Sequence, residues 1–211
     1  MKPYTEGHFH HQIECRSQRE ILSMPDADVS LYPSFFGQQE SDDLFQELLA
    51  KVEWRRDAIK IYGRQIPLPR LTAWYGDEGK SYTYSQISMD ATPWTPALLS
   101  IKARIETVAR ANFNSVLLNL YRDGTDGVSW HQDNEPELGA NPVIGSVSFG
   151  ETRTFQLKHR SRKDLGVVEV ELTHGSFLLM QGTTQHFWRH RIPKTPRVLK
   201  PRINLTFRKI S

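Results

Sequence analysis

The sequence predicts a mainly β protein of the α+β class, with helices placed before most of the strands. Six short runs after residue 113 are rich in leucine, β-branched and aromatic residues, and clusters of glycine, asparagine, proline and aspartate separate them. No helical pattern interrupts the runs, and this order is typical of a β-sandwich or a jelly roll. The runs are SVLLNLY (115–121), VIGSVSF (143–149), TRTFQLKH (152–159), VVEVEL (167–172), SFLLM (176–180) and RINLTFR (202–208).

Two helical patterns precede these strands. Over residues 41–52 apolar residues recur at three- and four-residue spacing, and Ser41 is a favourable N-cap residue. A second helix is predicted over residues 95–112, because Thr95 offers a cap and Pro96 suits the first helical position. We expect both helices to support one side of the β structure.

The length of 211 residues corresponds to one compact domain, which we place at residues 31–211. Residues 1–30 are polar and show no sustained period, so we expect a flexible arm there. Residues 54–93 mix aromatic residues with glycines, prolines and charges, which is typical of short hairpins and loops. Hydrophobic residues make up 38% of the chain, and no run approaches the ~20 apolar residues of a membrane helix.

The compartment is predicted from two features of the sequence. The first residues contain no apolar segment of the kind found in secretory signals, and Cys15 is the only cysteine. We therefore expect an intracellular protein, in the cytoplasm of a bacterium, or in the nucleus if the source is eukaryotic. The net charge of +3 permits a polyanionic partner without requiring one.

A metal site is suggested by three residues far apart in the chain. His131 and Asp133 could reach one ion, because alternate side chains of an extended segment point to the same face, although such pairs are common on surfaces. His190 precedes the run 202–208, in which polar and apolar residues alternate without exception. Its polar face is either a solvated surface or the lining of a cavity. The side chains on that face are Arg202, Asn204, Thr206 and Arg208.

Two histidines and one carboxylate form the facial triad of non-haem Fe(II) oxygenases, which leaves positions open for other ligands. Such an oxygenase also holds a dianionic co-substrate, and the planar fork of arginine binds a carboxylate through two hydrogen bonds. Asn119 and Tyr121 are two residues apart on the run 115–121 and would face the same interior. The same ligand set suits Zn²⁺ in a hydrolase, but that class gives no role to two inward arginines.

These residues resemble the AlkB family of Fe(II)- and 2-oxoglutarate-dependent dioxygenases, which repair alkylated bases in nucleic acids. The resemblance covers residues 54–210 and is closest to the DNA-repair branch that includes the mammalian double-strand-acting enzymes. It implies a double-stranded β-helix, or jelly roll, with residues 54–93 as a nucleotide-recognition lid. The motifs that carry it are Tyr75-Gly76-Asp77, Tyr82-Thr83-Tyr84-Ser85, Pro93-Trp94, Asn119-Leu120-Tyr121, His131-Gln132-Asp133-Asn134-Glu135, Ser148-Phe149-Gly150, His190 and Arg202-Ile203-Asn204-Leu205-Thr206-Phe207-Arg208.

The resemblance implies a catalytic centre that uses Fe(II), 2-oxoglutarate and dioxygen. His131, Asp133 and His190 would be the iron ligands. Arg202 would bind the distal carboxylate of 2-oxoglutarate. The residues that complete the co-substrate site would be Asn119, Tyr121, Asn204 and Arg208.

The resemblance also implies how a damaged base is held. Tyr84 and the ring of His131 would stack on the two faces of a flipped base, and Glu135 would lie near its exocyclic amine. Tyr62, in a tight turn followed by Arg64, aligns with a wedge that fills the gap in a duplex. A core aromatic residue near a turn is the alternative interpretation of Tyr62.

Two basic segments bear on the nucleic-acid partner. The run 158–163 lies between two predicted strands and is expected at a loop tip, either as a solvated turn or as a surface that neutralises phosphates. The loop 191–197 has fewer contiguous charges than the corresponding loop of relatives that grip a complementary strand. The preference for single or double strands is therefore left open.

The implied function is oxidative demethylation of N-alkylated bases in DNA, 1-methyladenine and 3-methylcytosine, with release of formaldehyde and succinate. Two alternatives stay open. One is a related dioxygenase that acts on RNA or protein, and the other is an inactive, metal-stabilised nucleic-acid-binding module. We expect the partner to be DNA with a flipped alkylated base, or RNA, and the enzyme to be a monomer without a membrane partner.

Overall fold

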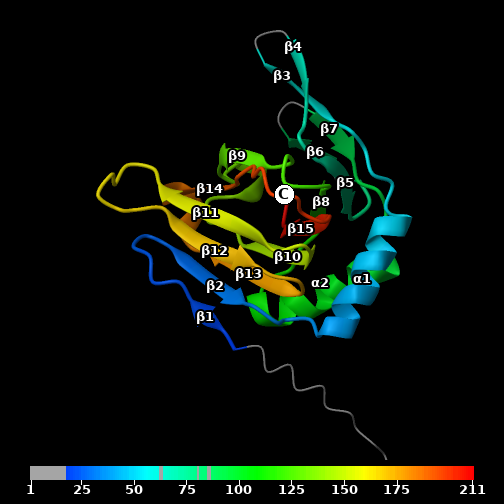
Figure 1. Cartoon of the computed structure of the whole chain (residues 1–211), viewed down its shortest axis with the longest axis horizontal. Helices are drawn as coiled ribbons and strands as arrows, with labels where there is room; N and C mark the ends of the chain where they lie inside the picture. The colour runs from blue at the N-terminus through cyan, green and yellow to red at the C-terminus, as the bar shows by residue number, and fades with distance from the viewer. Residues whose placement is uncertain (1–17, 62–63, 80, 85–86) are drawn as a thin grey trace, which may run out of the picture.

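The computed structural model describes residues 18–61, 64–79, 81–84 and 87–211, and its core is two antiparallel sheets (Figure 1). The larger sheet has seven strands in the order β1-β2-β13-β10-β15-β8-β5, and the smaller has four in the order β12-β11-β14-β9. The bounds of these strands are β1 Glu20–Ile21, β2 Asp28–Tyr32, β5 Leu71–Gly76, β8 Ser115–Tyr121, β9 Val128–His131, β10 Ile144–Gly150, β11 Arg153–His159, β12 Val168–Leu172, β13 Ser176–Gln181, β14 Trp188–Ile192 and β15 Arg202–Arg208.

The remaining elements are helices and two small hairpins. Strands β3 (Ala58–Ile61) and β4 (Arg64–Pro67) pair with each other, as do β6 (Ser81–Tyr84) and β7 (Ile87–Asp90). Both hairpins lie within the segment 54–93 and extend beyond the main sheets in Figure 1. The helices are α1 (Gln38–Lys51), α2 (Pro96–Ala109), the short α3 (Thr184–Phe187) and a 3-10 turn, η1 (Pro136–Leu138). No helix in the described part of the chain is long and apolar enough to cross a membrane.

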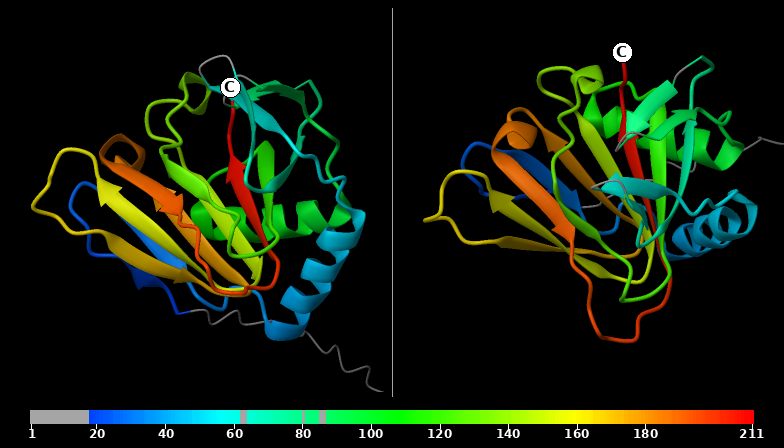
Figure 2. Two further views of the ribbon diagram at one scale, coloured as in Figure 1. Left: turned by 45° about the horizontal axis from the view of Figure 1, so that its top comes forward. Right: turned by 90° about the horizontal axis from the view of Figure 1, so that it is seen from above.

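The larger sheet separates two hydrophobic cores. Its helix-facing side chains pack against α1 and α2 in one core, which holds Leu48, Ile101 and Phe207. The other core lies between the two sheets and joins Leu117 and Leu178 of the larger sheet to Leu157 of the smaller. Figure 2 shows both helices grouped at the larger sheet, away from the smaller one. The predicted jelly roll with helices along one side is thus confirmed.

Strand β15 lies in the middle of the larger sheet and decides between the two interpretations of its polar face. Ile203, Leu205 and Phe207 point into the helix-side core. Arg202 and Arg208 point to the other side and are only 1% and 3% exposed. The solvated-surface interpretation is therefore wrong, and the cavity interpretation is correct.

Several predicted boundaries differ from the structure. Residues 28–32, which overlap the arm expected over residues 1–30, form β2 and pair with β13 instead. The first helix begins at Gln38 after Gly37, so Ser41 is not its cap but a buried residue of its first turns. The second helix begins after Thr95 as predicted, but it ends at Ala109 rather than near residue 112. Its chain then turns at Arg110, which has a left-handed backbone (φ 51°).

Gly150 ends β10 beside Arg202 of β15 and has a backbone that favours glycine (φ +89°). A methyl group there would clash with the Pro201 carbonyl oxygen and lie 2.8 Å from Phe45 Cε2. We expect Gly150→Ala to lower the free energy of unfolding by about 2 kcal/mol or more, measured by urea denaturation. Gly166→Ala is the control, because a methyl group added to Gly166 would meet no atom within 4 Å. Equal stability of the two variants would contradict this account of Gly150.

Candidate metal and co-substrate site

Three potential metal ligands meet at the smaller sheet. His131 ends β9, Asp133 follows two residues later, and His190 lies on β14 directly opposite His131 in the strand register. One ligand atom from each residue lies within 4.8 Å of the others. The structure therefore brings together the three residues that the sequence placed on different segments.

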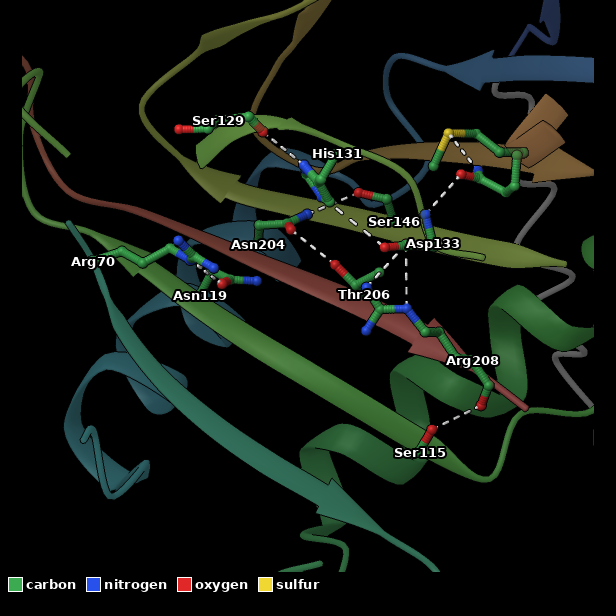
Figure 3. Close-up of polar contacts among 12 residues, drawn as sticks. Arg70, Ser115, Asn119, Ser129, His131, Asp133, Ser146, Asn204, Thr206 and Arg208 are labelled. Atoms are coloured by element: carbon green, nitrogen blue, oxygen red, sulfur yellow. Dashed lines mark hydrogen bonds and ion pairs between the residues drawn. The ribbon is translucent and has the colours of Figure 1, made fainter. Parts of the chain in front are cut away.

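The protonation state of His131 is set by its neighbours. The Nδ1–H group donates to the Ser129 carbonyl oxygen at 2.8 Å (Figure 3), which leaves Nε2 as the free nitrogen. Burial lowers the pKa of His131, and burial also lowers the pKa of His190 to about 3. Both rings are thus neutral at physiological pH, the form in which histidine binds a metal.

Asp133 divides its two oxygens between protein and cavity. Oδ2 accepts hydrogen bonds from Nε and Nη2 of Arg208 at 3.2 and 2.9 Å. Oδ1 is buried and has no hydrogen-bond partner among the described residues. Burial alone would raise the pKa of Asp133, but the positive charge of Arg208, the strongest opposing influence, helps to lower it to about 2. A charged oxygen without a partner is what a divalent metal ion requires.

Helix α3 holds the loop that carries Asp133. The backbone N–H of Asp133 donates to Oε1 of Gln185 in α3 at 3.1 Å, and Gln185 is only 1% exposed. Gln132 reaches the same helix, because its Nε2 donates to the Gln185 carbonyl oxygen at 2.5 Å. Helix α3 therefore supports the loop that carries Asp133, a role that no pattern in the sequence indicated.

Arg202 is a buried cation with unused donors. Its Nη2 donates to Ser148 Oγ at 2.9 Å, and its guanidinium carbon lies 5.1 Å from the centre of the Tyr121 ring. Nε and Nη1 have no hydrogen-bond partner in the described parts of the chain. Burial lowers the pKa of Arg202 to about 10, which still leaves it charged at neutral pH. A buried guanidinium in this state calls for an anion with two acceptor oxygens.

The cavity between Arg202 and the three ligands contains the other predicted co-substrate residues. Asn119 and Tyr121 line it from β8, and Asn204 lines it from β15. The Asn204 amide is already bound within the protein, because Nδ2 donates to Ser146 Oγ at 2.8 Å and Oδ1 accepts from Thr206 at 3.1 Å (Figure 3). Asn204 therefore forms part of the cavity wall together with Ser146, to which it is hydrogen-bonded.

Arg70 was missed by the sequence reasoning. It follows the β3-β4 hairpin, is only 3% exposed, and its Nε donates to Oδ1 of Asn119 at 2.6 Å (Figure 3). Its positive charge also contributes to the lowered pKa of His131. No alternation surrounds Arg70 in the sequence, so nothing there distinguished it from a surface arginine.

The predicted base-binding residues are only partly described. Glu135 follows the metal ligands, and its Oε2 is buried without a hydrogen-bond partner among the described residues. Tyr84 ends β6 and Arg64 begins β4, but the structure does not describe their side chains. Tyr62 lies outside the described residues. The roles of Tyr62, Arg64, Tyr84 and Glu135 therefore stay predictions.

Comparisons with known proteins agree with this geometry. Residues 28–208 match the family described as the 2OG-Fe(II) oxygenase superfamily. The chain is 43% identical to alpha-ketoglutarate-dependent dioxygenase alkB homolog 3 of Mus musculus over 190 residues, which cover 86% of this chain and 66% of that protein. The chain thus spans slightly less than two thirds of that relative.

Two further relatives extend the comparison. DNA oxidative demethylase ALKBH2 of Mus musculus is 41% identical over 188 residues, which cover 85% of this chain and 79% of that protein. A solved structure described as "The structure of OsALKBH1" matches with a TM-score of 0.65, covering 90% of this chain and 99% of that chain. Its sequence identity is 18%, so it supports the fold alone.

The contact between Arg208 and Asp133 predicts an indirect effect on metal binding. We expect Arg208→Gln to weaken the binding of Mn²⁺ about 10- to 100-fold, because the carboxylate loses the partner that orients it. Isothermal titration calorimetry with the full chain measures this affinity. Arg122→Gln is the control, because Arg122 forms a comparable pair with Asp126 at 2.8 Å outside the group of metal ligands. Unchanged affinity in Arg208→Gln would show that Asp133 needs no such support.

Proposed function

The chain belongs to the AlkB family of the 2OG-Fe(II) oxygenase superfamily, and we propose that it removes methyl groups from N-alkylated bases in DNA by oxidation. The proposed lesions are 1-methyladenine and 3-methylcytosine. One observation carries the proposal: a buried arginine with free donors faces the same cavity as two neutral histidines and a charged aspartate. A zinc hydrolase would need the three ligands but not the arginine.

Fe(II) fits the donor set of His131, Asp133 and His190. The fit is tested by the Oδ1 atom of Asp133, which is charged, buried and without a hydrogen-bond partner among the described residues. Two imidazoles and one carboxylate leave several coordination positions for other ligands. When bound, Fe(II) and 2-oxoglutarate activate dioxygen to oxidise the N-methyl group, which leaves as formaldehyde while the co-substrate becomes succinate and carbon dioxide.

2-Oxoglutarate is a dianion, and the chain supplies it with opposite charge. Arg202 offers Nε and Nη1 to one carboxylate, and Tyr121 and Ser148 hold the guanidinium in place. Asn119 is oriented by Arg70, so its amide presents Nδ2 rather than Oδ1 to the cavity. Arg208 adds positive charge while it holds Asp133.

A base paired within a duplex cannot enter this cavity, so the nucleotide must be flipped out of the stack. In our proposal Tyr84 and His131 stack on the flipped base, which offsets part of the unstacking cost at about 1–3 kcal/mol per base. Glu135 Oε2 is an acceptor without a partner among the described residues, suited to the exocyclic amine that adenine and cytosine share. Tyr62 would fill the gap in a duplex, with Arg64 beside it.

The wider setting is also part of the proposal. RNA is an alternative substrate, because none of the cavity residues described above would clash with the 2′-hydroxyl group that distinguishes RNA from DNA. We propose that the enzyme acts as a monomer, in the cytoplasm of a bacterium, or in the nucleus of a eukaryote. The single cysteine of the chain supports a reducing compartment.

The proposed function is tested by loading the full chain anaerobically with Fe(II) and 2-oxoglutarate and then adding oxygen and a methylated oligonucleotide. Mass spectrometry measures succinate and repaired base with single-stranded DNA, duplex DNA and RNA. We expect both products from DNA, and His131→Ala should lose at least about 100-fold in rate because the metal site is incomplete. Succinate without repaired base would point to another substrate, and no succinate from metal-loaded protein would contradict the oxygenase proposal.

Arg202 makes a separate prediction about the co-substrate. Arg202→Lys keeps the charge but loses the two-pronged contact, so we expect the KM for 2-oxoglutarate to rise about 10- to 100-fold. Succinate formation against 2-oxoglutarate concentration measures this change. Mn²⁺ affinity serves as the control and should stay within about twofold, since Arg202 does not contact the metal ligands. An unchanged KM would remove Arg202 from the co-substrate site.

A further inference from the structure

A second, open depression lies on the smaller sheet, separate from the cavity of the metal ligands. It has a volume of about 400 Å³ and is lined by Arg160, Ser161, His186, Phe187 and Arg189. Trp188 and His190 are buried on one side of β14, so Arg189 between them points to the opposite, exposed side. No residue of this depression belongs to the predicted site.

The depression concentrates positive charge that the protein does not neutralise. Arg160 and Arg189 are exposed, and neither forms an ion pair among the described residues. Lys158 of β11 lies directly opposite Arg189 of β14 in the strand register. Like charges in directly opposed positions destabilise a sheet, and a bound anion would relieve that cost. The neighbouring Arg162, by contrast, pairs with Asp164 at 2.6 Å.

An aromatic ring lies beside these cations. Phe187 is 37% exposed, and its ring stacks on His159 with the centroids 5.8 Å apart. His159 is buried and accepts backbone hydrogen bonds from Ser161 and Arg162 through Nδ1, so the support under Phe187 is rigid. Arginines beside an exposed ring match the phosphate and the base of a nucleotide.

The depression and the metal site share one element, α3. Arg160 Nη1 donates to the His186 carbonyl oxygen at 3.0 Å. Gln132, which lies between two metal ligands, donates to the Gln185 carbonyl oxygen at 2.5 Å and to the same His186 carbonyl oxygen at 3.4 Å. A strand with one nucleotide in the metal-site cavity therefore has a short path across Gln132 and α3 to the depression.

We propose that this depression binds one further nucleotide of the strand that carries the target base, with its phosphate at Arg160 and Arg189 and its base on Phe187. The inference rests on the proposed function, because it takes a nucleic acid strand as the substrate. It makes the run 158–163 a mixed segment: Lys158 and Arg160 serve the strand, His159 is structural, and Arg162 is neutralised by Asp164. The contacts are to phosphate and to a ring face, so the depression binds without base specificity.

The test measures the affinity of the full chain for two unmodified single-stranded oligonucleotides by fluorescence anisotropy. One is a trimer and the other has about twelve nucleotides. The longer strand supplies enough nucleotides to occupy both sites. In Arg160→Gln/Arg189→Gln we expect its Kd to rise at least about fivefold and the slope of log Kd against log salt to fall by about 0.7, since the contact with one phosphate is lost. Phe187→Leu should also weaken binding of the longer strand, but leave the salt slope as it is.

The matched control is Lys51→Gln/Arg110→Gln, which removes the same charge from the exposed surface of α1 and the end of α2, on the far side of the larger sheet (Figure 1). Equal weakening of binding in this control would show that the effect comes from net charge alone, and would overturn the proposal. Unchanged binding in Arg160→Gln/Arg189→Gln would overturn it as well. Circular dichroism and thermal unfolding show whether each variant folds. Binding of unmodified strands requires no demethylation, so loss of the proposed function alone would leave these affinities unchanged.

Discussion

The burial of two arginines on one central strand is the constraint on which the rest of the site depends. A guanidinium group inside a protein is costly unless it is paired, and β15 places Arg202 and Arg208 between the two sheets with 1% and 3% exposure. Arg208 meets this cost through Asp133, which fixes one metal ligand. For Arg202 this cost is offset only in part by the hydrogen bond to Ser148, so its remaining donors favour an anionic co-substrate. The metal site and the co-substrate site thus follow from the same strand.

The strict alternation of residues 202–208 made this arrangement partly predictable. A period of two fixes which side chains share a face, but it does not decide whether that face meets water or a second sheet. The decision comes from the smaller sheet, whose strands β9 and β14 are short and contain polar residues in place of a clear apolar pattern. The structure nevertheless brings together His131, Asp133 and His190, which were predicted from their chemistry and not from their secondary structure.

Residues that support the site from distant segments were the ones that sequence reasoning could not find. Gln185 holds the Asp133 loop through a backbone N–H, and Arg70 holds Asn119 across 49 positions of the chain. Such contacts depend on how distant segments meet, and glutamine or arginine at those positions is unremarkable by composition. The helix boundaries failed for a similar reason: Ser41 has a good capping side chain, yet packing places it inside α1, where its hydroxyl donates to the Phe36 carbonyl oxygen.

Helix α3 contacts both the metal-ligand loop and the basic depression on the smaller sheet. It has four residues, too few to be stable by itself, yet it contacts two functional regions of the protein. Its buried Gln185 supports the metal-ligand loop, whereas its exposed Phe187 and the His186 carbonyl oxygen border a basic depression. In the proposed function the protein holds a flexible strand while one base is turned into the cavity. Helix α3 would connect these two tasks, because a strand bound in the depression would contact the element that positions Asp133.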